Sequence, residues 1–418
     1  MAPTPRRRML LPQATTPRAC TGPSIFRRST DGLGNSRCMS VKVAPSPPID
    51  IPVKTTILPS LSSRPQLSSK DNRSKKCSND TMYIKPVASS ADGLDAGGFT
   101  QKGHAPGKLC NQDRYVCRKR CSDSPNSGSL FGVFDGHGKN GHHVSEWLST
   151  VMPIEIARAE QDMCALRAQA ATGTISCLHG SVEEMGAPNR EAAITALLQT
   201  LRSAHKRLED GLLRSGLEIQ WSGSTSCVVY LSGRHLVVMN VGDSRAVLGV
   251  HAPQANGERG ALCAKAISID HKPGNPDERE RIMQGGGCVA PSRTLMGRAA
   301  GPLRVWDSSR QAGLATSRSF GDMGYRVNGT GGVISEPQMH VFEITSEARF
   351  VVIGSDGLWD QLSPAEAVSL ASHFSSRGAD YAAEELVEAA LGRWRRVGRF
   401  HDDITAVVVK LPAPRASA

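Results

Sequence analysis

The chain has 418 residues, of which 39% are hydrophobic and 21% are charged, and its formal net charge at pH 7 is +11. This composition is typical of a globular protein and leaves room for one large domain or two smaller ones. No segment approaches the roughly 18 consecutive apolar residues that a membrane-spanning helix requires, and no apolar stretch follows the first arginines as in a secretory signal. We therefore expect a soluble intracellular protein without a membrane span.

The positive charge is concentrated at the N-terminus. Residues 1–95 hold 15 Lys and Arg residues against six Asp and no Glu, so the rest of the chain has a net charge of only about +2. Up to residue 97 the sequence is rich in Ser, Pro and Arg and has neither helical nor strand periodicity. Such a segment buries too little apolar surface to offset its conformational entropy. We expect residues 1–97 to form a disordered basic tail.

Three roles are open for this tail. Six arginines and no acidic residue among the first 30 positions resemble an organelle transit peptide, although prolines interrupt any amphipathic helix. A solvated tail would leave the protein in the cytoplasm or nucleus, and Met1-Ala2 lacks the glycine that myristoylation needs. A tail that binds nucleic acid or a membrane surface is the third alternative, but its arginines are not interleaved with aromatic residues that stack on bases. We expect a cytoplasmic or nuclear protein and no nucleic-acid partner.

Eleven cysteines are scattered through the chain, and several lie in apolar segments, such as Cys227 in STSCVVYL and Cys263 in ALCAKAI. We interpret these cysteines as reduced, buried thiols. Cys110, Cys117 and Cys121 lie close together, but their spacing contains no CxxC pair and no matching His or Cys set follows. A structural zinc ion is therefore not expected.

From residue 98 to residue 412 the sequence alternates short strand-like segments with long helical ones, which is typical of an α+β domain. Apolar residues recur every three or four positions over 189–214 and predict a helix with one buried face. STSCVVYL and HLVVMNV, joined at Ser232-Gly233-Arg234, predict a β-hairpin. We expect SRAVLGV to continue this hairpin as the third strand of an antiparallel meander.

Two further helices are predicted near the C-terminus. Ser363 and Glu366 form a capping box with Pro364 in the first turn, and another helix is expected over about 380–395. Residues 158–189 and 251–262 are less regular and are interpreted as surface insertions. The chain contains no internal repeat.

Aspartates occur where apolar strands end: FGVF leads into Asp135, VVIG into Ser355-Asp356, and NVG into Asp243. One Asp-Gly pair alone is typical of a turn, but several at strand ends indicate a shared site. If these strands share a sheet, Asp135, Asp356 and Asp402 meet at one edge, where uncompensated negative charge is costly. Bound cations would resolve this repulsion, and oxygen ligands without a Cys or His set favour Mg²⁺ or Mn²⁺.

Taken in order, these segments resemble the motifs of the protein phosphatase 2C family. The motifs are KLCNQD at 108–113, FDGHG at 134–138, GSTS at 223–226, NVGDSRAVL at 240–248, DHKPGNPDERERI at 270–282, GLATSRSFGD at 313–322, SDGLWD at 355–360 and HDDIT at 401–405. Each motif alone is a weak signal, whereas the ordered set over residues 99–411 is specific. The resemblance implies an antiparallel β-sandwich flanked by helices on both faces, with a two-metal site in a cleft at one end.

The resemblance also implies the activity, which is hydrolysis of phosphoserine and phosphothreonine in proteins by metal-activated water without a phosphoenzyme. It implies two Mg²⁺ or Mn²⁺ ions, whose ligands would be Asp135, Gly136 through its carbonyl, Asp356 and Asp402. A weaker third metal site would use Asp243 and Asp360 together with Asp356.

Four further residues would act on water or substrate. Asp113 and Gln112 would hold metal-bound water, Lys108 would pair with the phosphate dianion, and His137 would protonate the departing Ser or Thr oxygen as a general acid. This chain differs from many family members at two of these positions: Lys108 stands where they have Arg, and Gln112 stands where they have Glu. Lysine binds phosphate as a point charge without arginine's bidentate fork, and glutamine keeps an oxygen but removes one negative charge.

The main alternative is a pseudophosphatase, a folded family member that serves as a regulatory binding module after losing metal ligands. The sequence retains all four expected metal ligands, which favours an enzyme. Residues 270–306 contain Gly285-Gly286-Gly287 and few apolar residues, and they match the flap that borders the cleft in the family. We expect phosphoprotein substrates and a monomeric protein.

Overall fold

The computed structural model describes residues 94–412, apart from positions 125–126, 172–186, 254–258, 295, 297, 328–330 and 399. Of the predicted basic tail, residues 1–93 lie outside the described residues. Strand β1 begins at Ala96 and Leu94 is already buried. The packed part of the chain thus includes at least four residues before the predicted boundary at residue 98.

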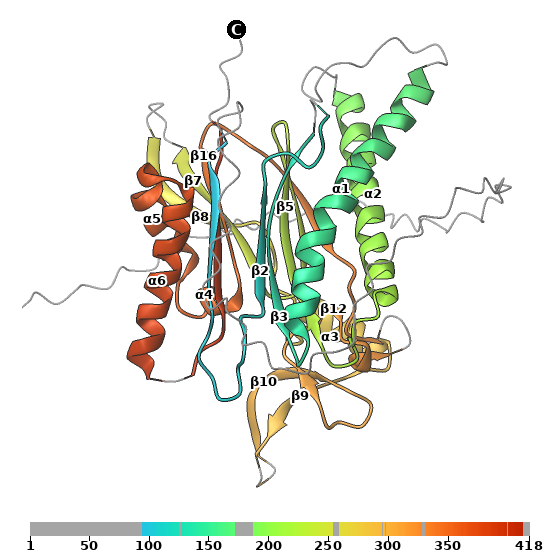
Figure 1. Ribbon diagram of the computed structural model, residues 1–418, viewed down its shortest axis with the longest axis vertical. Helices are drawn as coiled ribbons and strands as arrows, with labels where there is room; N and C mark the ends of the chain where they lie inside the picture. Colours follow the sequence, from blue (N-terminus) through green and yellow to red (C-terminus); the bar gives the residue numbers. More distant parts are fainter. Residues whose placement is uncertain are drawn as a thin grey trace, which may run out of the picture. The chain divides into compact units, whose positions relative to one another are not determined.

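Two antiparallel sheets form the centre of the domain (Figure 1). The five-stranded sheet contains, from edge to edge, β1 (Ala96–Gln101), β17 (Ile404–Lys410), β16 (Ala348–Gly354), β7 (Arg245–Pro253) and β8 (Arg259–Ala266). The seven-stranded sheet contains β12 (Phe320–Gly321), β4 (Gly223–Ser224), β3 (Ser129–His137), β5 (Ser226–Ser232), β6 (His235–Val241) and β15 (Gln338–Glu343), and β2 (Asp113–Arg118) pairs with β3. In the five-stranded sheet β1 pairs with β17, so the first and last strands of the domain are neighbours.

Helices cover the outer face of each sheet (Figure 1). Helices α1 (Gly141–Ala171) and α2 (Ala187–Arg214) pack on the seven-stranded sheet, and α5 (Pro364–Phe374) and α6 (Ala379–Val397) pack on the five-stranded sheet. The short helix α4 (Asp356–Trp359) follows β16 directly. This arrangement confirms the predicted helix-flanked β-sandwich. Within the described residues, no helix combines the length and the apolar character that crossing a membrane requires.

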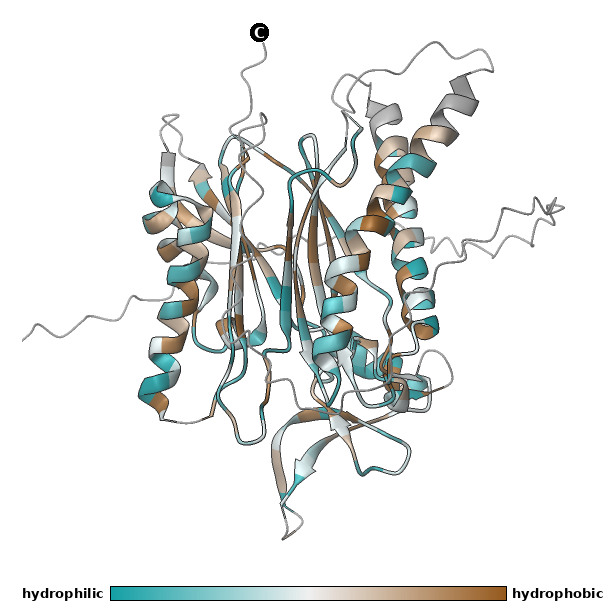
Figure 2. Ribbon diagram, in the orientation of Figure 1, coloured by the Kyte–Doolittle hydropathy of each residue, from teal (hydrophilic) through white to brown (hydrophobic). Residues whose placement is uncertain are grey.

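Strand β3 shows why the central strands are almost continuously apolar. Because side chains alternate along a strand, Phe131 and Val133 contact the apolar core between the sheets, whereas Leu130 and Phe134 contact the core beneath α1 and α2. Figure 2 shows the same pattern, with hydrophobic residues concentrated on the strands of both sheets. Both faces of these strands are buried, so the sequence has no alternation of polar and apolar residues there.

Three helix predictions are confirmed. The periodic segment over 189–214 lies in α2, whose buried residues include Leu201, Leu208 and Leu212. The capping box is present at α5, where Ser363 accepts a hydrogen bond from the Glu366 amide and the Glu366 carboxylate accepts one from the Ser363 amide. The helix expected over about 380–395 is α6.

The predicted three-strand meander is wrong at its third strand. Strands β5 and β6 form the expected hairpin, but β7 pairs with β16 and β8 in the other sheet. The chain crosses between sheets at Gly242, which has φ of 104°, a conformation that favours glycine. A side chain at this position would also lie 2.6 Å from Thr225. Both 232–234 and 242–244 contain a glycine among polar residues, yet only the first segment returns the chain to the same sheet.

The described parts of the two predicted surface insertions belong to helices and strands. Helix α1 continues to Ala171 and α2 begins at Ala187, so only 172–186 lie outside the described residues. The segment 159–171 is rich in Ala and Gln, whose helix propensity is high even without an amphipathic pattern. Likewise β7 reaches Pro253 and β8 starts at Arg259, and the two strands pair.

The seven cysteines in the described part of the chain are free thiols. Cys227 is buried between the sheets, as predicted. Cys263 is exposed, so the expectation of burial is wrong for this residue. Strand β8 lies at the edge of its sheet, where Leu262 and Ala264 face the α5 side and Cys263 points away from it.

The segment predicted to form a flap contains secondary structure of its own. Helix α3 (Pro276–Gln284) is followed by β9 (Cys288–Arg293) and β10 (Ala299–Trp306), which form a small sheet with β11 (Gly313–Leu314). Shorter elements complete this part of the chain, namely η2 (Met323–Tyr325), β13 (Arg326–Val327) and β14 (Gly331–Gly332). A small apolar cluster that includes Ile282 and Val305 ties α3 to β10.

A buried carboxylate anchors α3 to the chain before β12. Glu278 accepts hydrogen bonds from Arg318 Nε at 3.0 Å, from Arg281 Nη2 at 2.9 Å and from Ser317 Oγ at 2.7 Å. Burial alone raises the pKa of Glu278, but the hydrogen bonds from Arg318 and Arg281 outweigh it and lower the pKa to about 2. Glu278 therefore stabilises the fold in its charged form.

Replacing this carboxylate should cost stability in a pH-dependent way. Glu278→Gln should lower the free energy of unfolding at pH 7 by about 2 kcal/mol, the value of hydrogen bonds to charged groups. The pKa of about 2 in the folded protein lies below the ordinary 4.5, so this stabilisation is complete above 4.5 and is lost as pH falls toward 2. Urea unfolding at several pH values measures the difference, which should shrink below about pH 4.5.

Glu280→Gln is the matched control, because Glu280 is exposed on the same helix. It should change the free energy of unfolding by less than about 0.5 kcal/mol. Equal losses in the two variants, or a loss in Glu278→Gln that does not depend on pH, would contradict this account.

Candidate active site

Carboxylates from both sheets meet at one end of the sandwich. Asp135 lies in β3 and Asp243 follows β6, both in the seven-stranded sheet. Asp356 follows β16, and Asp402 lies two residues before β17, both in the five-stranded sheet. The sequence suggests convergence at the edge of one sheet, whereas the structure achieves it with strand ends of two sheets that face each other.

Electrostatics show how closely these groups are gathered. Burial and the neighbouring charges of Asp243 and Asp402 raise the pKa of Asp356 to about 8. Burial and the charges of Asp113 and Asp356 also raise the pKa of Asp135 well above its usual range. A pocket at this end of the domain is lined by residues that include Lys108, Gln112, Gly136, His137, Asp356, Asp360 and Asp402.

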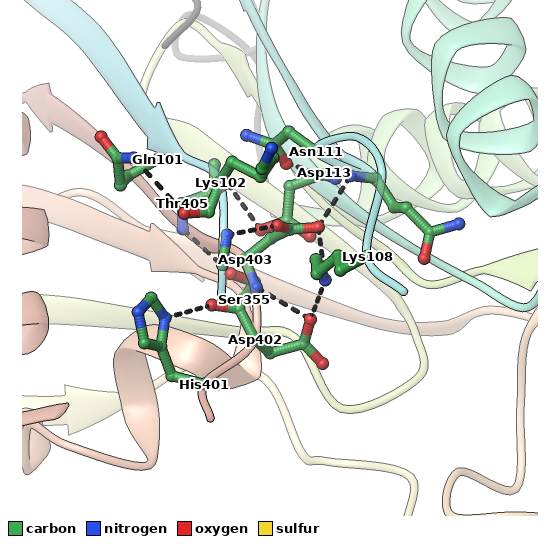
Figure 3. Close-up of polar contacts among 12 residues, drawn as sticks. Gln101, Lys102, Lys108, Asn111, Asp113, Ser355, His401, Asp402, Asp403 and Thr405 are labelled. Carbon is green, nitrogen blue, oxygen red and sulfur yellow. Dashed lines mark hydrogen bonds and ion pairs between the residues drawn. The ribbon is translucent and has the colours of Figure 1, made fainter. Parts of the chain in front are cut away.

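Asp113 is fixed directly behind this group. The register of β2 and β3 pairs Asp113 with Asp135. Thr405 Oγ1 donates to Asp113 Oδ2 at 2.6 Å, and the Asp113 amide donates to Asn111 Oδ1 at 2.9 Å (Figure 3). Burial and the charge of Asp403 raise the pKa of Asp113 to about 7. Asp113 is thus a positioned carboxyl whose pKa is close to neutrality.

Asp403, which the sequence analysis does not single out, holds the loop that carries Lys108. Its carboxylate accepts hydrogen bonds from the amides of Gly103 and Gln112, each at 2.7 Å, and forms an ion pair with Lys108 at 2.9 Å (Figure 3). Lys108 also pairs with Asp402. Burial alone lowers the pKa of Lys108, but these two carboxylates raise it. The sequence did contain a signal for this role, namely the adjacent pair Asp402-Asp403 just before a strand. Because successive side chains of an extended segment point to opposite sides, one of the two can face the pocket and the other the interior.

Asp322 is a second functional residue that the sequence did not assign. Its Oδ2 lies 2.5 Å from His137 Nε2 and accepts a hydrogen bond from Ser319 Oγ at 2.5 Å. Burial lowers the pKa of His137, but the charge and hydrogen bond of Asp322 outweigh it, and the pKa is raised. Gly223 makes room for this pair, since a side chain there would lie 2.2 Å from Asp322 Oδ2.

The donor set suits divalent cations. Asp356 Oδ1 is buried and has no hydrogen-bond partner among the described residues, although an unpaired buried carboxylate oxygen is costly. Two ammonium groups balance part of the charge, because Lys108 pairs with Asp402 and Lys272 with Asp243. In the described part of the chain, no three His, Cys, Asp or Glu side chains stand together as a ready-made ligand set. The carboxylates thus fit hard cations in their chemistry.

Known proteins with a similar sequence belong to one class. The family model described as Protein phosphatase 2C matches residues 107–395. Probable protein phosphatase 2C 48 from Oryza sativa subsp. japonica is 35% identical over 288 residues, which is 68% of this chain and 76% of the relative. Probable protein phosphatase 2C 72 from Arabidopsis thaliana is 33% identical over 307 residues, which is 73% of this chain and 82% of the relative.

Solved structures show the same fold. Serine-threonine phosphatase 2C from Toxoplasma gondii superposes with a TM-score of 0.63 and 24% sequence identity, covering 79% of this chain and 99% of that one. The fold, the carboxylate pocket and these matches define a metal-dependent phosphatase. The chain belongs to the protein phosphatase 2C family of protein serine/threonine phosphatases.

The pair of His137 and Asp322 should act as one unit. Asp322→Asn should lower kcat by about tenfold to a hundredfold with little change in KM, because the imidazole loses the charge that orients it and favours its protonated form. His137→Ala should lower kcat in the same way. In the double variant the second substitution should add almost nothing. Steady-state kinetics on a phosphothreonine peptide measures all three, and additive losses would mean that Asp322 does not act through His137.

Proposed function

We propose that phosphate release from phosphoserine and phosphothreonine takes place in this pocket, with two Mg²⁺ or Mn²⁺ ions. The observation that carries the proposal is the convergence of carboxylates from both sheets around one pocket that also holds Lys108 and His137. The ligands would be Asp135, the Gly136 carbonyl, Asp356 and Asp402, with Asp243 and Asp360 left for a weaker third ion.

When bound, these ions would supply a nucleophilic water at neutral pH and would offset the negative charge of the phosphoryl oxygens. A side chain at Gly136 would lie 2.4 Å from Gly141 O, so this position of the pocket requires glycine. Asp113, fixed by Thr405, would accept a hydrogen bond from the attacking water. Gln112 donates its amide to Gly138 O at 2.7 Å, which leaves its amide oxygen as an acceptor.

Lys108 and His137 would act on the substrate itself. The Lys108 ammonium, fixed between Asp402 and Asp403, presents a positive charge to the phosphate dianion at the pocket surface. The charge and hydrogen bond of Asp322 raise the pKa of His137, which would give its Nε2 proton to the departing Ser or Thr oxygen. Because Nε2 lies 2.5 Å from Asp322 Oδ2, this contact would have to open as the leaving oxygen approaches.

Removing the Asp356 carboxylate should raise the stability of the metal-free protein and lower its activity with metal. In EDTA at pH 7, Asp356→Asn should raise the free energy of unfolding by more than about 1 kcal/mol. The reason is that the pKa of about 8 in the folded protein exceeds the ordinary 3.8, so the charged form destabilises the metal-free fold and stability falls as pH rises between these values. With saturating Mn²⁺, kcat/KM on a phosphothreonine peptide should fall by about a hundredfold or more. Urea unfolding and phosphate release measure the two effects.

Asp123→Asn controls for the loss of one negative charge, because Asp123 is exposed and does not line the pocket. It should match the wild type in both measurements. Turnover by the wild type in EDTA, or full activity of Asp356→Asn in Mn²⁺, would overturn the metal assignment.

The charge of Lys108 should matter more than its shape. Lys108→Met should raise KM by about tenfold or more, since a hydrogen bond to a charged group is lost. Lys108→Arg should keep KM within about threefold of the wild type, because it retains the charge and adds a second donor. Steady-state kinetics and competitive inhibition by inorganic phosphate measure binding. Lys139→Met, at an exposed position just beyond His137, controls for general attraction of the anion and should leave KM unchanged.

A further inference from the structure

The active-site pocket has an aromatic side that the phosphate chemistry does not use. Besides the charged residues, the pocket is lined by Pro106, Trp394, Phe400 and His401, here called the aromatic wall. Trp394 lies in the last turns of α6, and Phe400 and His401 lie between α6 and β17. None of these side chains carries a negative charge for a cation or a fixed positive charge for phosphate.

The aromatic wall is tied to the segments that carry the candidate metal ligands. Trp394 Nε1 donates to Gly357 O at 2.9 Å, and Gly357 is the neighbour of Asp356. The rings of Trp394 and His401 stack with centroids 6.1 Å apart at 26°. His401 precedes Asp402 and forms two backbone hydrogen bonds of 3.0 Å with His104 (Figure 3 shows His401 beside Asp402). Trp394 and His401 are therefore held in place relative to the candidate metal ligands.

The outer end of the wall is open to solvent. Phe400 is 60% exposed, and its ring lies 6.0 Å from the ring of His104. Leu109, next to the pocket residue Lys108, is 84% exposed. Single exposed apolar residues are ordinary, but exposed apolar residues that border a catalytic pocket form a surface on which a ligand can bury its own apolar groups.

We propose that the aromatic wall receives a bulky hydrophobic side chain of the substrate, within two positions of the phosphorylated residue. The inference rests on the proposed function of the pocket and adds to it the substrate class, namely phosphoproteins with a hydrophobic residue beside the phosphosite. An extended peptide advances by roughly 3.3–3.6 Å per residue, so a side chain one or two positions from the phosphate stays within reach of the same pocket. A substrate bound by its phosphate alone would leave the wall exposed to water.

The preference can be measured on the full-length protein with Mn²⁺ and three pools of phosphothreonine peptides. The two positions on each side of phosphothreonine hold Leu and Phe in the first pool, Ser and Gly in the second, and Asp and Ser in the third. The wild type should prefer the first pool over the second by about tenfold in kcat/KM, at the low end of what an apolar pocket discriminates. In Phe400→Ser this ratio should fall to about threefold or less, with kcat/KM on the Ser and Gly pool unchanged.

Two variants make the result specific. Phe400→Leu keeps an apolar side chain and should keep most of the preference. Ile154→Ser removes a residue of α1 that is also 60% exposed and does not line the pocket, and it should behave as the wild type. Because Phe400 is exposed, its substitution should leave the thermal midpoint of unfolding unchanged, and that midpoint is measured for every variant.

The outcomes distinguish this inference from the proposed function. Turnover by the wild type without preference for the first pool, or a preference that Phe400→Ser retains, overturns the role of the aromatic wall and leaves the proposed function intact. An equal rise in turnover of all pools in Phe400→Ser would mean that another segment of the chain covers the wall, which also overturns the inference. No turnover of any pool by the wild type overturns the proposed function itself.

Discussion

Packing of the two sheets against each other holds together carboxylates that would separate in solution. The raised pKa values of Asp113, Asp135 and Asp356 express the free energy that this gathering costs. The apolar core between the sheets, with residues such as Phe131 and Val407, offsets the cost, since each fully buried large apolar side chain contributes roughly 1.5–3 kcal/mol. The site therefore depends on a sandwich that is stable without it.

The crowding of carboxylates between the two sheets also explains why polar partners surround the pocket. Where carboxylates crowd together, each is given a partner that fixes its direction, as Thr405 does for Asp113 and Lys272 for Asp243. Asp403 and Asp322 face inward and serve as anchors for Lys108 and His137. Lys108 pairs with Asp402, so a residue proposed to bind phosphate contacts a candidate metal ligand directly. Binding of metal and positioning of the substrate groups thus use one network.

Much of this arrangement could be predicted from sequence, and the failures have physical causes. Motifs at strand ends located Asp135 and Asp356, because a strand that ends in a carboxylate is a local feature, and the HDDIT motif located Asp402. The sheet to which β7 belongs is not local, since it depends on the backbone conformation at Gly242 and on partners far along the chain. Asp322 escaped assignment because its role depends on proximity to His137, 185 positions away. The assignment of roles to the pocket residues stays a prediction until it is tested by substitution.

The pairing of β1 with β17 has a consequence for biosynthesis. Lys108 and Asp402 are separated by 294 positions, and both lie beside this pair of strands. Contacts between residues so far apart in sequence form late in folding, because the entropy cost of closing the long loop must be met before the contact can stabilise the chain. During translation the first strand and the Lys108 loop therefore wait, without their partner, until the last strand has left the ribosome. A nascent chain that lacks β17 has no complete pocket, so phosphatase activity requires translation through this strand.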